Sequence, residues 1–270
     1  MSDLPSPHDW VKRSAQSLKV ERLEAFFSGH AFDAHKHDTY AIGRTLSGVQ
    51  RFRYRGVSKN SLPGETMILH PDVEHDGHAG SASGFRYQML YISPALVQQV
   101  LHGKPLPFFK DGVSHDPRLS AATAALLNSM EDELDPLEED DSLYGLVTTL
   151  QAVCGYNQAH GTTHDYAAAA LAREYIDDCI EQAITLDDLA KCAGRDRWSL
   201  SKDFRAYFGT SPHRYMTMRR LDRVKAAVFA GRTLVDASVE AGFFDQSHMT
   251  RHFKKAFGIS PSRWCLSLGE

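Results

Sequence analysis

The sequence predicts an α+β chain in two parts: an N-terminal β-barrel followed by helices, then an all-α C-terminal half with two helix-turn-helix units. Two observations carry this prediction. Residues 51–55 alternate between arginine and aromatic side chains, as a half-buried strand requires. The segment 200–215 recurs as 249–264 at a fixed offset of 49 residues, so apolar, turn and basic positions stay in register.

Strands are expected until about residue 93. Short apolar segments at 66–70 and 85–92 follow the alternating strand and are separated from it by turn residues, a spacing typical of a barrel. Helices are expected next at 119–133 and 142–160, where apolar residues recur at helical spacing. An acidic stretch interrupted by proline, 131–141, separates the two helices.

Each copy of the C-terminal repeat contains signals for two helices. Thr185 precedes Asp188 by three residues and Thr233 precedes Asp236 in the same way, a pattern typical of a helix N-terminus. The other signals are the glycines expected to end the first helices and the aspartates expected to cap the second helices: Gly194, Gly242, Asp196 and Asp245.

The second helix of each copy is predicted to be amphipathic. Leu200, Phe204 and Phe208 repeat every four positions and are expected to face the core, as are Met249, Phe253 and Phe257 in the other copy. The opposite face is polar and basic, which suits contacts to phosphates and purine edges. Helix-turn-helix units place such a helix in the DNA major groove.

Residues 241–261 resemble the C-terminal signature of AraC/XylS-family transcriptional regulators, and residues 198–215 are similar to the family's first unit. The resemblance implies two recognition helices, joined by a long helix at 212–230, that enter major grooves ~34 Å apart on promoter or operator DNA. It places base or phosphate contacts at Arg197, Trp198, Ser201, Lys202, Gln246, Ser247, Thr250 and Arg251, and Lys254 on the same basic face is expected to contact phosphate.

A simpler interpretation of these residues stays open. An exposed basic face can be only solvated surface, and Trp198 can be only a cover over Leu200 and Tyr207. The duplication favours the DNA-binding role, above all for Lys202 and Arg251. Asp203 departs from the basic pattern, because a carboxylate in this position repels phosphates unless it points away.

The N-terminal half resembles the cupin-like sensor domain of the same family. His35 and His37 follow Gly29 at the spacing of the cupin metal motif, and His75 stands where a third imidazole enters, but the expected glutamate after His37 is absent. A metal site, ligand-contacting imidazoles and ordinary core histidines are all compatible with this pattern. The predicted ligand-binding set comprises His35, His37, Phe52, Tyr54, His75, Tyr87 and Tyr91, although the aromatic rings can also simply fill the barrel.

Charge and composition agree with a two-part chain. The net charge is −4, yet the part from Ala170 onward carries 16 Lys or Arg and 13 Asp or Glu. The domains are expected at 1–160 and 167–270, with a linker at 161–166. The four cysteines lack Cys-x-x-Cys spacing and no apolar run approaches ~20 residues, so we expect a cytoplasmic protein without disulfides, cofactor or membrane contact.

The function predicted from these features is that of a transcriptional regulator, not an enzyme, controlled by a small-molecule effector of unknown identity. The apolar stripe of the 142–160 helix can pair with another chain or pack on the barrel. A homodimer is expected, because the resemblance implies it, and RNA polymerase is a further candidate partner. Two alternatives remain: a cupin-type metal-dependent enzyme fused to a DNA-binding domain, and a DNA-binding protein that needs no effector.

Overall fold

The computed structural model describes residues 9–14, 19–128, 130–131, 135–154 and 164–266. The chain divides into two compact units, one drawn mainly from residues 1–158 and the other mainly from residues 159–270. We call them the barrel unit and the helical unit. The predicted linker at 161–166 falls partly outside the described residues, so its bounds remain a prediction.

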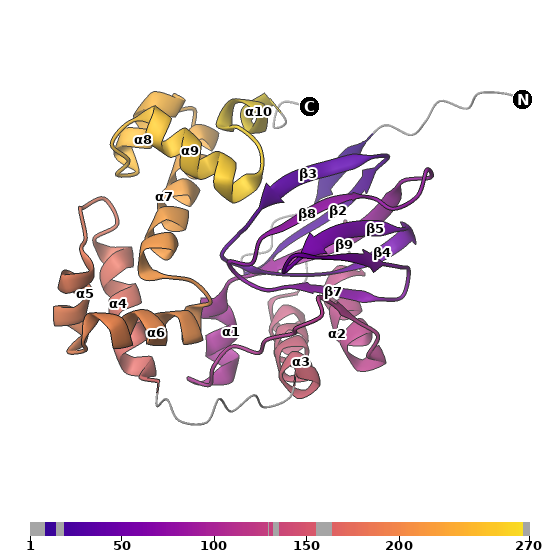
Figure 1. Cartoon of the computed structure of the whole chain (residues 1–270), viewed down its shortest axis with the longest axis horizontal. Coiled ribbons are helices and arrows are strands. Elements are labelled where there is room, and N and C mark those ends of the chain that lie inside the picture. The colour runs from indigo at the N-terminus through magenta and orange to yellow at the C-terminus, as the bar shows by residue number, and fades with distance from the viewer. Residues whose placement is uncertain (1–8, 15–18, 129, 132–134, 155–163, 267–270) are drawn as a thin grey trace, which may run out of the picture. The chain divides into compact units, whose positions relative to one another are not determined.

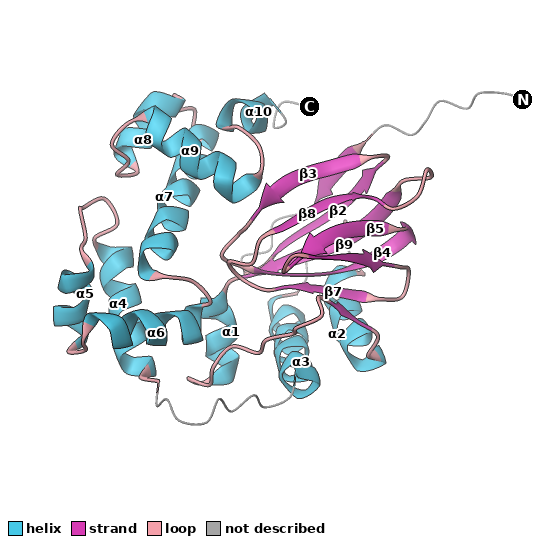
Figure 2. Ribbon diagram, viewed as in Figure 1, coloured by secondary structure: helices cyan, strands magenta, loops and turns pink. Residues whose placement is uncertain are grey.

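Two antiparallel sheets form the barrel unit (Figures 1 and 2). The six-stranded sheet has the order β1-β2-β9-β4-β7-β10, and the four-stranded sheet has the order β3-β8-β5-β6. The strands are β1 Trp10–Arg13, β2 Glu21–Phe27, β3 His30–His35, β4 Tyr40–Gly48, β5 Gln50–Tyr54, β6 Val57–Ser61, β7 Thr66–Leu69, β8 His75–Ala79, β9 Phe85–Ile92 and β10 Val113–Ser114.

Side-chain alternation on β5 explains how the sheets pack. Phe52 and Tyr54 are each 1% exposed, whereas Arg51 and Arg53 are exposed, as the sequence predicts. The two aromatic rings join a buried cluster with side chains of the six-stranded sheet, so the core lies between the sheets. Gly43 permits a close approach of β4 to β9 within the six-stranded sheet, because a Cβ atom at this position would lie 2.3 Å from the Gln88 carbonyl oxygen.

Three helices complete the barrel unit: α1 Pro94–Leu101, α2 Pro117–Leu127 and α3 Pro136–Cys154. The predicted helix bounds were wrong in two places, because α2 ends at Leu127 and α3 begins at Pro136 inside the expected interruption. Proline is well suited to the first turn of a helix, where its missing N–H is not needed. Residues 155–160 of the predicted second helix lie outside the described part of the chain.

The apolar stripe of α3 packs within the chain. Its buried members are Leu143, Leu146, Val147 and Leu150, and α3 contacts α1 and α2. Of the two arrangements that the sequence allowed, the structure therefore favours internal packing. Another surface has to be used if two copies of the chain associate.

The helical unit contains the two helix-turn-helix units predicted from the sequence (Figure 2). Its helices are α4 Tyr166–Asp178, α5 Leu186–Ala193, α6 Arg197–Phe208, α7 Pro212–Phe229, α8 Leu234–Glu240, α9 Gln246–Phe257 and α10 Pro261–Leu266. The pairs α5–α6 and α8–α9 are the two helix-turn-helix units. The 18-residue helix α7 joins them and is about 27 Å long at 1.5 Å per residue.

The predicted helix caps are present. The Thr185 hydroxyl accepts a hydrogen bond from the Asp188 backbone N–H, and the Asp188 carboxylate accepts one from the Thr185 backbone N–H, which completes a capping box. Gly194 ends α5 in the left-handed conformation with φ of 59°. Asp196 and Asp245 cap α6 and α9. Within the described residues, no helix is both long and apolar enough to cross a membrane.

Candidate functional site

Helix α6 has an apolar inner face and a polar outer face. Leu200 and Phe204 are 0% exposed. Trp198 is 69% exposed, and Arg197 and Lys202 are also exposed. The apolar positions fix the rotation of the helix about its axis because they must be buried. The four candidate DNA contacts of the first unit, which include the half-buried Ser201, therefore lie on the solvent-facing side of α6.

Helix α9 repeats this arrangement in the second unit. Met249 and Phe253 are 0% exposed and pack in a core cluster with α7 and α10. Ala256 is fully buried and Phe257 only partly, so the inner face is rotated slightly from the predicted one. The predicted contact residues are exposed or half-buried on the other side: Gln246, Ser247, Thr250, Arg251 and Lys254.

Asp203, which departs from the basic pattern, does not face solvent. It is 2% exposed, and its Oδ2 accepts a hydrogen bond of 2.9 Å from Arg195 Nε. His164 Nδ1 lies 3.0 Å from the other carboxylate oxygen. The carboxylate therefore serves as an internal ionic contact of the first unit and does not weaken the outer basic face.

Two candidate contact residues, Arg197 and Ser201, already have partners on the surface. Arg197 Nε lies 3.3 Å from Asp187 Oδ1, in a pair in which both side chains are more than half exposed. Arg205 donates to the Ser201 carbonyl oxygen at 3.0 Å and also to the Ser201 hydroxyl. Exposed pairs of this kind contribute ~0–1 kcal/mol, so they can be exchanged for contacts to DNA at little cost.

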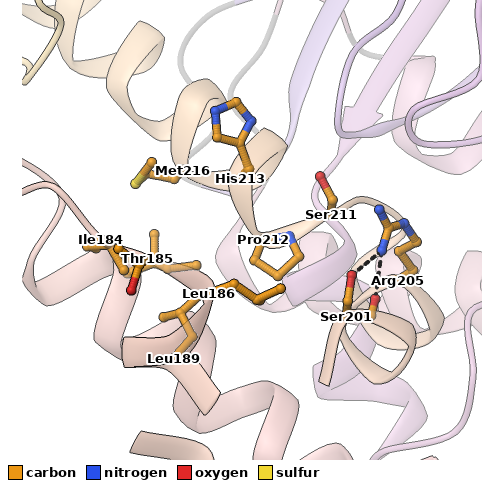
Figure 3. A pocket seen from close by; sticks show the side chains of 11 residues that line it. Ile184, Thr185, Leu186, Leu189, Ser201, Arg205, Ser211, Pro212, His213 and Met216 are labelled. Atoms are coloured by element: carbon orange, nitrogen blue, oxygen red, sulfur yellow. Dashed lines mark hydrogen bonds between the residues drawn. The ribbon is translucent and has the colours of Figure 1, made fainter. Parts of the chain in front are cut away.

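A pocket of about 380 Å³ lies beside α6 in the helical unit (Figure 3). Ser201 and Arg205 of α6 form one side of it, and His213 of α7 another. Its apolar lining consists of Ile176, Ile184, Leu186, Leu189, Pro212 and Met216. None of the ligand-binding residues predicted from the sequence lines this pocket.

The predicted ligand-binding aromatics are packed in the core of the barrel unit. Phe52, Tyr54 and Tyr87 are buried, and Tyr91 is partly buried at the edge of the same cluster. Burial raises the pKa of the Tyr54 and Tyr87 hydroxyls, which are therefore neutral at physiological pH. The rings lie in the core between the two sheets, and their part in ligand binding stays a prediction.

The three histidines predicted from the N-terminal half of the sequence do come together. One ligand atom from each of His35, His37 and His75 lies within 4.8 Å of the others. His75 Nδ1 lies 2.9 Å from the Val73 carbonyl oxygen, which can only accept, so Nδ1 donates this hydrogen bond and, in the neutral imidazole, Nε2 is the acceptor. This orientation of the imidazole suits a metal ion as well as a ligand that donates hydrogen bonds.

Two family models match the chain. The AraC-like ligand binding domain matches residues 17–147, and a helix-turn-helix domain matches residues 189–265. The chain belongs to the AraC/XylS family of transcriptional regulators. Both matched regions agree with the division into a sensor-like barrel and a helical DNA-binding part.

Relatives in the AraC/XylS family match over most of their length. The uncharacterized HTH-type transcriptional regulator YbfI of Bacillus subtilis is 23% identical over 252 residues, which is 88% of this chain and 91% of that protein. The XylDLEGF operon transcriptional activator 3 of Pseudomonas putida is 28% identical, with 83% and 71% covered. The structure of ToxT from Vibrio cholerae has the same fold, with a TM-score of 0.65 at 14% identity over 92% of this chain and 98% of that one.

Sequence reasoning missed a histidine cluster between α7 and α9. His248 and His252 are four residues apart on α9, and their Nε2 atoms lie 3.0 Å from each other. The His213 ring of α7 lies 6.4 Å from the His252 ring. The four-residue spacing was a readable signal for the first pair, because such residues share a helix face. The approach of α7 was not readable from local sequence.

Because of this cluster, we expect the free energy of unfolding to decrease in acid. Burial, together with neighbouring cationic groups and imidazoles, lowers the pKa of His252 to about 4. Because the unfolded chain has the ordinary value of ~6.5, protonation favours unfolding. The contribution of His252 is complete above pH 6.5 and is lost as the pH falls towards 4. Urea unfolding followed at several pH values should show this decrease.

A matched pair of variants isolates the effect. His252→Gln should flatten the dependence of the urea midpoint on pH between 6.5 and 4. His115→Gln alters an imidazole whose side chain is 77% exposed in the barrel unit and should leave the dependence as it is. Parallel pH profiles for wild type and His252→Gln would contradict the assignment.

Proposed function

We propose that this regulator reads operator DNA with α6 and α9 together, through the exposed side chains of both helices. The observation that carries the proposal is the duplication: two helices of equal length, each capped by aspartate and ended by a left-handed glycine, present basic faces. A helix-turn-helix unit makes its base contacts from this second helix. Two such helices joined by one rigid helix fit successive major grooves of a duplex.

The modest charge of the helical part supports docking of both helices at once. Non-specific affinity for DNA grows with the number of phosphates that Lys and Arg neutralise. From Ala170 onward the chain has only slightly more Lys and Arg (16) than Asp and Glu (13), so its non-specific affinity should be low. Selection of bound fragments from genomic DNA with the full-length protein tests the proposal. Enrichment of a motif with two half-sites about one helical turn apart is expected, and enrichment without any shared motif would contradict it.

Arg251 is the residue expected to read a base. Arg251→Ala should weaken binding to the selected site by ~1–3 kcal/mol and relax the preference at one base position, because arginine makes bidentate contacts to guanine. Lys254→Ala is the matched control on the same helix, since a phosphate contact weakens all sequences alike and reduces the salt slope by about one. Titrations with specific and random duplexes measure both effects. Equal losses on the two duplexes for Arg251→Ala would remove its base-reading role.

We propose that a small-molecule effector binds near His35, His37 and His75. One ligand atom from each imidazole lies within 4.8 Å of the others, and the Phe32 ring lies 6.4 Å from the His75 ring, so an apolar group stands beside the polar ones. An effector that binds only the folded state raises the melting temperature in proportion to RT ln(1 + [L]/Kd). A metabolite panel should therefore contain compounds that raise the melting temperature of the wild type and not of His75→Ala. A flat response across the panel would favour regulation without an effector.

A metal-dependent activity is the alternative that a specific observation favours. The spacing of the three imidazoles and the orientation of His75 fit a divalent metal ion, for which these residues would be the ligands and which would supply Lewis-acid chemistry. We favour a protein without catalytic activity, because its relatives are regulators. Stoichiometric metal in the purified protein, lost in His75→Ala, would support the alternative.

We further propose that the protein forms a homodimer and contacts RNA polymerase. The α3 stripe is used within the chain, so a dimer has to use the exposed side of α3, where Tyr144 and Leu137 are 60% and 71% exposed, or another surface. Sedimentation of wild type and Tyr144→Ala at micromolar concentration tests the use of this face. A monomeric wild type would remove the dimer from the account.

A further inference from the structure

We propose that the pocket beside α6 binds an amphipathic organic monoanion, and that this ligand competes with DNA. The site lies entirely within the helical unit and is distinct from the effector site proposed near His75. Its volume of about 380 Å³ is within the ~300–1,000 Å³ range of small-molecule sites. It does not depend on the effector proposal, because no residue is shared between the two.

The pocket has an apolar end and a cationic end (Figure 3). Ile184, Leu186 and Leu189 form one end, from α5 and the segment before it. Arg205 and Ser211 lie at the other end. A ligand with an apolar body gains from removing that body from water at the first end and from placing its charge at the second.

The charge of Arg205 selects an anion. Arg205 and His213 are the ionisable side chains of the lining, and the lining includes no carboxylate. Burial lowers the pKa of His213, so at neutral pH the positive charge is that of Arg205. Both hydrogen bonds from Arg205 to Ser201 come from Nη1, and a guanidinium carries five N–H donors. Arg205 can therefore bind a carboxylate while it keeps its hydrogen bonds to Ser201. A cationic ligand with the same body meets the like charge of Arg205 at this end.

Occupation of the pocket should interfere with DNA binding. Ser201 and Arg205 belong to the outer, polar part of α6, which carries the candidate DNA contacts of the first unit. An anion at Arg205 adds negative charge where phosphates have to approach, and it holds the side chain against the pocket. The second unit is untouched, so the ligand should weaken DNA binding without unfolding the protein.

Methionine methyl NMR on the full-length protein tests the site with octanoate as the probe. Met216 lines the pocket, whereas Met67 and Met89 lie in the barrel core, so their signals separate the two locations. Octanoate should shift the Met216 signal in a saturable manner and leave the two barrel signals in place. Octylammonium and 1-octanol share the tail, and acetate shares the head group. All three should bind at least tenfold more weakly.

Two variants complete the test. Arg205→Gln removes the charge and Leu186→Trp fills the apolar end, so each should raise the Kd for octanoate at least tenfold. Arg197→Gln is the matched control, because Arg197 is an exposed arginine on the same helix outside the pocket. Octanoate should also lower wild-type affinity for the selected duplex and have no such effect with Leu186→Trp.

Three results would overturn the proposal: shifts at Met67 and Met89 without one at Met216, equal binding of octanoate and octylammonium, or an unchanged Kd in both variants. The first of these would instead place the ligand in the barrel, in line with the effector proposal. Failure of the barrel proposal, in turn, leaves the Met216 response unaffected. The two ideas can therefore fail separately.

Discussion

Phe253→Ala is expected to lower the free energy of unfolding of the helical unit by about 3–5 kcal/mol, because it removes a fully buried ring and leaves a cavity. Phe253 is 0% exposed and its ring lies 4.6 Å from Phe257 and 5.7 Å from Trp264. It also fixes the rotation of α9, so the candidate contacts on the opposite face lose their common orientation. Urea unfolding followed by tryptophan fluorescence measures the loss, since Trp264 packs against this ring.

Phe244→Ala is the control for this prediction. Phe244 is 90% exposed just before the same helix, and its replacement should change stability by no more than ~0.5 kcal/mol. The comparison separates burial from residue type. Similar losses for the two phenylalanines would mean that the inner and outer faces of α9 have been assigned wrongly.

Arg195→Ala is expected to lower the free energy of unfolding, and by more than Arg197→Ala does, because it leaves the buried carboxylate of Asp203 with only part of its compensation. The Arg195 Nε to Asp203 Oδ2 distance is 2.9 Å and the aspartate side chain is 2% exposed. His164 remains beside the other oxygen. Urea unfolding of the full-length protein in the absence of DNA measures the effect.

Arg197→Ala provides the matched comparison two residues along the chain. Arg197 pairs with Asp187, but both side chains are exposed, so its loss should cost ~0–1 kcal/mol. The double variant Arg195→Ala with Asp203→Ala should be less destabilised than Arg195→Ala alone, because the uncompensated charge is gone. A double variant whose loss equals the sum of the two single losses would show that the two residues do not interact.

The helical unit could be predicted closely because its signals are local. Caps at Thr185 and Asp196 and the glycine at 194 depend on neighbours a few residues away, and the repeat doubled the evidence for each. Helix α7 ends within one residue of its predicted end. The outer faces of α6 and α9 followed from the same periodicity, since burying one face exposes the other.

The remaining features depend on contacts between distant segments. The role of Asp203 required the positions of Arg195 and His164, which no local pattern specifies. Helix α3 began earlier than expected because Pro136 was interpreted as a break and not as a first-turn residue. The pocket beside α6 is assembled from α4, α5, α6 and α7, so its existence depended on tertiary packing.

Hydroxyl-radical footprinting on a selected genomic fragment tests the central claim most directly, that α6 and α9 bind adjacent major grooves together. We predict two protected regions on one face of the duplex, centred ~34 Å apart. Lys202→Ala should weaken protection in one region and Arg251→Ala in the other. A single protected region in the wild type, or the same change in both regions with either variant, would contradict the account.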